Sequence, residues 1–142
     1  MSVDENKATV RRIIEEIWNI GNSSLVAELF SVEYIFHSPA GDELRGSEGF
    51  ERRMKLLKRA FPDVHMEIED IFGEGDKVAY RIKTKGTFFG KLGDIEPNGK
   101  SFQTRASIFS RFQNGKVIED FEYMTEPSFI QQIGIVWKPG RK

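Results

Sequence analysis

The chain has 142 residues, 39% of them hydrophobic, and no cysteine, as is typical of one domain with a substantial core. Its 21 basic and 22 acidic residues give a net charge of −1, which argues against nucleic acid or an anionic membrane surface as a partner. The absence of cysteine excludes disulfides, thiolate metal ligands and a cysteine nucleophile. The N-terminal segment is acidic and no long apolar run follows, so we expect a cytoplasmic protein.

Helical periodicity dominates the first part of the sequence. Apolar residues recur at helical spacing from Val10 to Trp18, after a capping-box pattern that starts at Ser2, and Gly21 is expected to end this helix. A short helical piece over 23–30 leads into a strand-like segment at 33–38. A third helix is predicted from Ser47 until Pro62 stops it.

After Pro62 the pattern alternates with period two, which is typical of strands. Four segments show it, at 64–72, 77–89, 101–112 and 116–124. Helices followed by a run of strands predict an α+β domain. We expect a long loop at 90–100, a short last helix with Thr125 as its N-cap, and a flexible tail at 136–142 of a single domain spanning 1–142.

The last hairpin decides which carboxylates face the interior. Asn114 and Gly115 predict a two-residue turn, because both tolerate the positive φ that such turns require. In that register Glu119 faces the apolar side of the sheet, with Ile108, Phe121 and Tyr123 on the same side. Asp120 and Glu122 then lie on the outer face, paired with Arg111 and Arg105.

The preceding hairpin is expected to have a three-residue turn at 74–76. Ile68 then lies opposite Ile82 and Met66 opposite Thr84, while opposite charges meet on the far side of the sheet. The same register turns Asp70 inward, beside Tyr80.

Three stretches resemble a known family: "FPDVHMEIEDIFGEGDKVAYRIKTKGTFFG", "PNGKSF" and "NGKVIEDFEYMTEPSFIQQIG". They are similar to the SnoaL-like polyketide cyclases, which share the fold of nuclear transport factor two and ketosteroid isomerase. The likeness spans roughly residues 7 to 134. It implies a cone in which three N-terminal helices cover a strongly curved mixed or antiparallel sheet, with an apolar pocket between them and usually a dimer. It also implies cofactor-free aldol cyclisation, with an acidic side chain as general acid and base.

The resemblance extends to some polar positions and departs at others. His37 matches the family's histidine ahead of a proline-containing loop, and Glu119 matches a glutamate usual in the last strand. Phe121 stands where the family has tryptophan. Thr125 stands where an aspartate is common, and Phe88 where a histidine follows the Gly-Thr pair.

These observations leave two function classes open. In the first, the chain is a cyclase or isomerase acting on a small hydrophobic carbonyl compound that is polyketide- or steroid-like. Glu119 is then the general acid or base, and His37 or Tyr123 stabilises the oxyanion. In the second, the chain is a non-catalytic binding or dimerisation domain, and Glu119 is held for structure. The candidate residues for contact with a ligand are Trp18, Phe36, Tyr80, Phe102, Ile108, Phe121 and Thr125.

We expect neither a metal nor another cofactor, since the two histidines are far apart and no ligand-spacing motif occurs. We also expect a homodimer. The outer face of the predicted sheet carries Phe109, Ile118 and Met124 among charged residues. This is an unusual amount of apolar surface for a solvent-exposed face.

Overall fold

The computed structural model describes residues 2–124 and 126–135. The predicted tail at 136–142 and the predicted N-cap Thr125 therefore lie outside the described residues.

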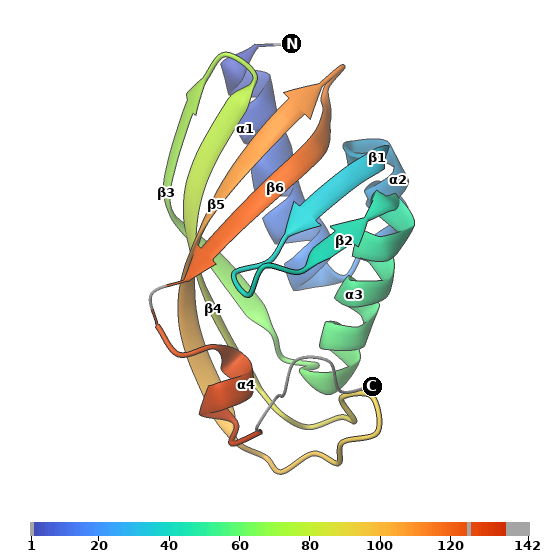
Figure 1. Ribbon diagram of the computed structural model, residues 1–142, viewed down its shortest axis with the longest axis vertical. Helices are drawn as coiled ribbons and strands as arrows, with labels where there is room; N and C mark the ends of the chain where they lie inside the picture. Colours follow the sequence, from blue (N-terminus) through green and yellow to red (C-terminus); the bar gives the residue numbers. More distant parts are fainter. Residues whose placement is uncertain (1, 125, 136–142) are drawn as a thin grey trace.

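The fold is α+β, as predicted, with helices against one face of a mixed six-stranded sheet (Figure 1). The strand order is β2-β1-β6-β5-β4-β3. Neighbouring strands are antiparallel except for β1 and β6, which are parallel. The strand bounds are β1 Phe30–His37, β2 Glu43–Arg45, β3 His65–Glu74, β4 Lys77–Thr87, β5 Ser101–Gln113 and β6 Lys116–Met124.

The N-terminal helical segment is two helices joined end to end. The α-helix α1, Val3–Arg12, continues directly into the π-helix η1, Ile13–Ile20. The predicted capping box is confirmed, since Ser2 and Glu5 exchange both hydrogen bonds. Gly21 follows with a φ of 90°, a left-handed conformation that ends the helix.

The other helices are short except for α3. They are the 3₁₀-helix η2, Ser23–Leu25, and the α-helices α2, Val26–Leu29, α3, Gly46–Ala60, and α4, Phe129–Gln132. The N-cap of α4 is Ser128, which forms a capping box with Gln131. The short strand β2, which pairs with β1, was not predicted.

A bulge in β6 changes the register of the last hairpin. The turn at Asn114 and Gly115 forms as predicted, with positive φ at both residues, and Phe112 lies opposite Val117. Ile118 is then an extra residue, and beyond it Arg111 lies opposite Glu119. The predicted register is therefore wrong by one residue past the turn, and each side chain after the bulge faces the side opposite to that predicted.

A second bulge occurs in β3, at Glu69. The pairs of Ile68 with Ile82 and Met66 with Thr84 are confirmed. Nearer the turn, Glu74 lies opposite Lys77, so the turn has two residues and the predicted three-residue turn at 74–76 is wrong. In this register Asp70 lies opposite Arg81, and its Oδ2 forms an ion pair with that guanidinium at 2.8 Å. Asp70 is exposed, so the prediction that it faces inward beside Tyr80 is wrong.

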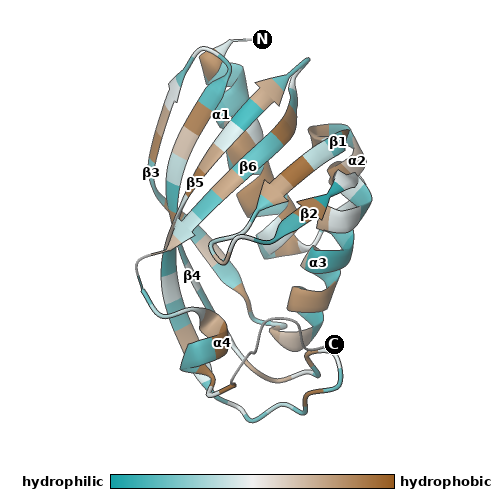
Figure 2. Cartoon of the chain, viewed as in Figure 1, coloured by the Kyte–Doolittle hydropathy of each residue, from teal (hydrophilic) through white to brown (hydrophobic). Residues whose placement is uncertain are grey.

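The two faces of the sheet differ in polarity, and Figure 2 shows hydrophobic and hydrophilic residues alternating along β4 to β6.

The long loop between β4 and β5 begins against the C-terminal end of α3. The N–H groups of Phe89 and Gly90 there both donate to the carbonyl oxygen of Ala60, at 3.1 and 3.0 Å. A Cβ at Gly90 would overlap the carbonyl oxygen of Arg59, so this close approach requires glycine.

None of the helices in the described part of the chain combines the length and the apolar character needed to cross a membrane.

Candidate functional site

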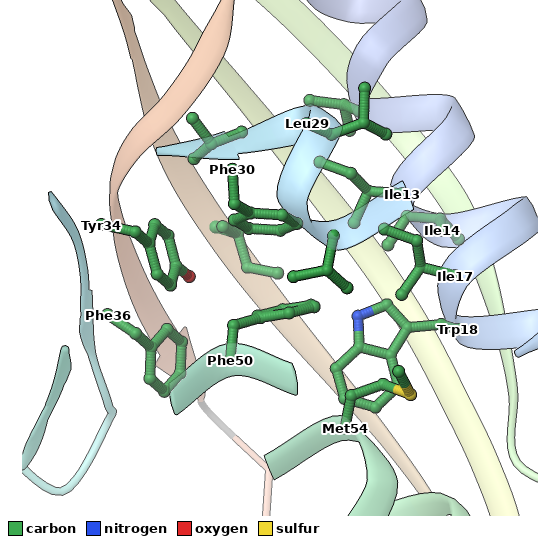
Figure 3. Close-up of a cluster of buried hydrophobic side chains, with 14 of the residues drawn as sticks. Ile13, Ile14, Ile17, Trp18, Leu29, Phe30, Tyr34, Phe36, Phe50 and Met54 are labelled. Atoms are coloured by element: carbon green, nitrogen blue, oxygen red, sulfur yellow. The ribbon is translucent and has the colours of Figure 1, made fainter. Parts of the chain in front are cut away.

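An apolar cavity of about 100 Å³ lies between the helices and the inner face of the sheet. Figure 3 shows aromatic rings converging on this region from three elements: Trp18 from η1, Tyr34 and Phe36 from β1, and Phe50 from α3. The ring centroids of Trp18 and Phe50 are 5.8 Å apart in an edge-to-face arrangement. The polar residues that also line the cavity are Tyr34, Arg53, Tyr80, Thr84, Thr104, Asp120 and Glu122.

Asp120 is the most buried acid of this cavity, with 7% of its surface exposed. Its Oδ2 accepts a hydrogen bond from the Tyr34 hydroxyl at 2.7 Å, and its Oδ1 accepts another from Ser110. Burial raises the pKa of Asp120 to about 6, although both hydrogen bonds favour the carboxylate and oppose the shift. The group therefore exchanges its proton close to neutral pH.

Glu122 lines the same cavity two residues further along β6. Burial raises the pKa of Glu122, and the positive charge of Arg53 opposes this shift. The two acids also act on each other, because Glu122 contributes to the raised pKa of Asp120. The inner face of β6 thus carries two carboxyl groups that resist being charged together.

Two tyrosine hydroxyls accompany these acids. Burial raises the pKa of Tyr34 and of Tyr80 well above the usual value, and the charge of Asp120 adds to both shifts. Both side chains are therefore neutral hydroxyl groups at neutral pH, able to donate hydrogen bonds. Tyr34 uses this capacity to hold Asp120.

The predicted catalytic residues lie outside the cavity, on the outer face of the sheet. Glu119 is bound by His37 Nε2 at 2.7 Å and by Arg111 Nη2 at 3.1 Å. The hydrogen bond from His37 and the pairing with Arg111 lower the pKa of Glu119, the opposite of the shift expected for a buried acid. Tyr123 is 56% exposed. The prediction that Glu119 and Tyr123 face the interior is wrong because of the bulge at Ile118.

His37 belongs to this outer cluster and not to the cavity. Its ring stacks on Phe121, with centroids 4.1 Å apart and planes 5° apart. Its Nδ1 lies 3.5 Å from Glu43. Phe121 is on the outer face with it, so its predicted place in the pocket is also wrong.

Five of the predicted ligand-contact residues do line the cavity, and Thr125 lies outside the described residues. The five are Trp18, Phe36, Tyr80, Phe102 and Ile108. Phe88, which stands where the family commonly has histidine, is fully buried in a separate cluster with Phe61 and Phe102. Prediction from the sequence missed Tyr34, Arg53, Asp120 and Glu122.

Among the residues 2–124 and 126–135, no three His, Cys, Asp or Glu side chains lie close enough together to hold a metal ion. Metal independence of the protein stays a prediction.

Solved structures with the same fold cover nearly the whole chain. AclR from Streptomyces galilaeus is 26% identical, with 94% of this chain and 83% of that chain covered and a TM-score of 0.79. IdmH from Streptomyces antibioticus is 25% identical, with coverage of 92% and 99% and a TM-score of 0.75. TsrD from Streptomyces laurentii shows the fold alone, at 19% identity, coverage of 96% and 99%, and a TM-score of 0.81.

No curated protein sequence matches the chain. The sequence pattern of one family matches residues 8–133, which includes all the cavity-lining residues named above. This match and the cone of helices over a curved sheet lead to one assignment: the chain belongs to the SnoaL-like polyketide cyclase family.

Proposed function

We propose that the chain is a cofactor-free cyclase or isomerase that moves a proton at a carbon next to a carbonyl group, with Asp120 as the general base and acid. The observation that carries this proposal is the buried carboxyl of Asp120 in the wall of an apolar cavity, with a pKa of about 6. A base whose pKa lies near the working pH is both largely ionised and able to return the proton. His37, Glu119 and Tyr123 have no part in this proposal.

The chemistry requires only one acid and a dry cavity. The carboxylate of Asp120 removes the proton from the carbon next to the carbonyl, and the electron pair of the C–H bond forms an enolate. In a cyclisation the enolate carbon attacks a second carbonyl of the same molecule, and the resulting alkoxide takes the proton back from Asp120. In an isomerisation the proton returns to a different carbon. Tyr34 and Ser110 hold the carboxylate in place through the step.

The size of the cavity favours a small substrate. Pockets for drug-sized ligands have volumes of about 300–1,000 Å³, whereas this cavity has about 100 Å³. A cavity of about 150 Å³ is enough for benzene. We therefore propose a hydrophobic carbonyl compound no larger than about one ring, in place of a polycyclic polyketide or steroid.

The relatives support a cyclase without fixing the reaction. IdmH is provisionally described as a polyketide cyclase, and AclR is provisionally described as a hydroxylase. The family description is also that of a polyketide cyclase. Because the same fold carries different activities, the reaction has to be argued from the site.

The test is the exchange of α-hydrogens for deuterium in small cyclic ketones, followed by NMR. Asp120→Asn is expected to reduce the exchange rate by roughly 100-fold or more, since it keeps the shape of the side chain and removes the base. Glu119→Gln is the matched control, because it changes the adjacent acid on the other face of β6, and it is expected to leave exchange within about 2-fold.

Two results would contradict the proposal. If Glu119→Gln is the sensitive variant, the outer cluster is the site and the cavity is not. If wild-type protein binds ketones but exchanges no hydrogen above the rate in buffer, the chain is a binding domain, the second function class.

We further propose that the chain forms a homodimer through the outer face of the sheet, and that it acts in the cytoplasm. The apolar residues exposed on that face differ from those predicted. Phe109 is 51% exposed as expected, but Met124 lines the cavity and Ile118 is the bulge residue. Phe72, Phe121 and Tyr123 join Phe109 there instead, and we call these four residues the outer aromatic patch.

A further inference from the structure

Arg53 brings a positive charge to an otherwise apolar part of the cavity wall. It projects from α3, in the turn after Phe50, and lines the cavity. Its guanidinium carbon lies 4.9 Å from the centre of the Phe36 ring and 6.0 Å from that of Trp18. These distances are typical of cation–π contacts. The aromatic rings thus hold the guanidinium at the cavity without neutralising it.

Arg53 differs from the other arginines of the described chain because it is partly buried and also lacks a charged partner. Five arginines form ion pairs with carboxylates: Arg12, Arg45, Arg81, Arg105 and Arg111. In residues 2–124 and 126–135, the arginines without such a pair are Arg11, Arg52, Arg59 and Arg53. The first three are exposed to water, whereas Arg53 is partly buried.

A partly buried cation without a partner is unusual. Guanidinium groups remain protonated in proteins, and charges taken out of water are normally paired. Water hydrates the charge of an exposed arginine, but Arg53 faces aromatic rings and a cavity. Its position therefore has an electrostatic cost that an anion in the cavity would offset.

Glu122 does not fill this role within the protein. The carboxyl group of Glu122 forms no ion pair with Arg53. The charge of Arg53 nevertheless acts to lower the pKa of Glu122. Burial raises the pKa of Glu122 despite the opposing effect of Arg53. Among the described residues, no side-chain hydrogen bond or ion pair engages the guanidinium of Arg53, so its donors remain available to a ligand.

We propose that Arg53 is the specificity residue of the cavity and that the ligand carries a carboxylate, which Arg53 binds while the carbonyl faces Asp120. The substrate class is thus a small keto acid. This inference rests on the proposed function, because it concerns the ligand of the same cavity.

Arg53 lines the cavity from α3 and Asp120 lines it from β6, so the proposed carboxylate and the reacting carbonyl of the ligand are assigned to different residues of the cavity wall. The charge of Arg53 acts on Glu122 and on Tyr34, whose hydroxyl holds Asp120. We therefore assign the carboxylate of the ligand to Arg53 and its carbonyl to Asp120, within the same cavity.

The experiment compares matched acids and amides by isothermal titration calorimetry at neutral pH. The pairs are levulinate with levulinamide and oxocyclohexanecarboxylate with its amide. For at least one pair, wild-type protein is expected to bind the acid about 10-fold or more tightly than the amide, since a charge-assisted pair with arginine is lost with the amide.

Three variants separate a specific role of Arg53 from a general effect on the fold. Arg53→Met is expected to remove the preference for the acid and to leave affinity for the amide within about 3-fold, because methionine keeps apolar contact with the rings. Arg53→Lys should retain part of the preference, as the charge remains without the planar fork. Arg52→Met is the control, since Arg52 is the adjacent exposed residue of α3, and it should behave as wild type.

The inference is overturned if wild-type protein binds the amides as tightly as the acids, if Arg53→Met keeps the preference, or if none of the acids binds at millimolar concentration. Asp120→Asn distinguishes these outcomes from failure of the proposed function. If the keto acids bind in an Arg53-dependent way but undergo no Asp120-dependent exchange, the ligand class stands and the enzyme proposal fails.

Discussion

Adjacent carboxylates of β6, Glu119 and Asp120, lie in opposite environments. Glu119 is held as an anion by a histidine and an arginine on the outer face. Asp120 is buried, and its hydrogen bonds to two hydroxyls do not fully compensate the loss of water. Ion pairing favours the charged form and burial disfavours it, so the two residues contribute to stability with opposite sign.

Asp120→Asn is expected to stabilise the fold above about pH 6. The folded pKa of Asp120, about 6, exceeds the ordinary value of 3.8, so ionisation of this residue destabilises the folded state. This destabilisation is fully present above about pH 6 and disappears as the pH falls towards 3.8. The pKa difference sets an upper limit of about 3 kcal/mol. Urea unfolding of variant and wild type across this pH range measures the effect.

Glu119→Gln is expected to have the opposite effect and to destabilise the fold at neutral pH. The folded pKa of Glu119 is lowered, so its stabilising contribution is present above the ordinary value of 4.5 and is lost as the pH falls through the folded value. The variant should be less stable than wild type at neutral pH and equally stable in acid. If both variants shift stability in the same direction, the assignment of the two faces of β6 is wrong.

At the scale of elements, the bulge in β6 determines which acids reach the cavity. A classic bulge adds one residue to one strand and leaves its partner unchanged. Here Ile118 is that residue, and Val117 before it and Asp120 after it both face inward. Without the bulge, strict alternation from Val117 would place Glu119 inward and Asp120 outward.

Deletion of Ile118 tests this account of the strand. The pairs on either side of the bulge, Phe112 with Val117 and Arg111 with Glu119, would become consecutive in a regular hairpin. Asp120 would keep its inward orientation, so α-hydrogen exchange should persist within about 10-fold, at a stability cost of about 1–3 kcal/mol. Loss of exchange in a variant that still melts cooperatively would show that the bulge itself shapes the site.

The sequence predicted the elements better than the register. The capping box at Ser2 and the turn at Asn114 and Gly115 were read correctly because each is a local signal, specified by neighbouring residues. The bulge at Ile118 has no such local signal, because it depends on the fit of β6 between β5 and β1. A single extra residue therefore inverted the predicted cavity face while leaving the fold class correct.

The same distinction, between local sequence signals and features set by packing, applies to the residues of the cavity. Trp18, Phe36, Tyr80, Phe102 and Ile108 were predicted because apolar periodicity marks the inner face of an element. Arg53 was not, since a charged residue on an amphipathic helix is normally a surface residue. Only the packing of α3 beside the aromatic rings of β1 and η1 brings its guanidinium to the cavity.

For the whole molecule, the two faces of the sheet have different proposed roles. The inner face carries the acids of the proposed site. On the outer face, pairing across the strands places Phe72, Ala79, Phe109 and Phe121 in one lateral row, and Tyr123 packs on Phe109 with ring centroids 5.9 Å apart. An apolar row of this kind, bordered by ion pairs such as that of Arg105 with Glu69, is typical of an interface with a polar rim.

The dimer proposed for this face gives the last prediction. Wild-type protein at a concentration on the order of 10 µM is expected to sediment as a dimer, since the outer aromatic patch leaves four large side chains exposed to water in the monomer. Phe109→Asp should shift it to the monomer, because two-fold symmetry places the new carboxylate twice in one desolvated interface. Phe89→Asp is the matched control: Phe89 is 61% exposed but lies in the loop after β4, away from the outer aromatic patch. A monomeric wild type, or a Phe109→Asp variant that remains dimeric, would exclude this face as the interface.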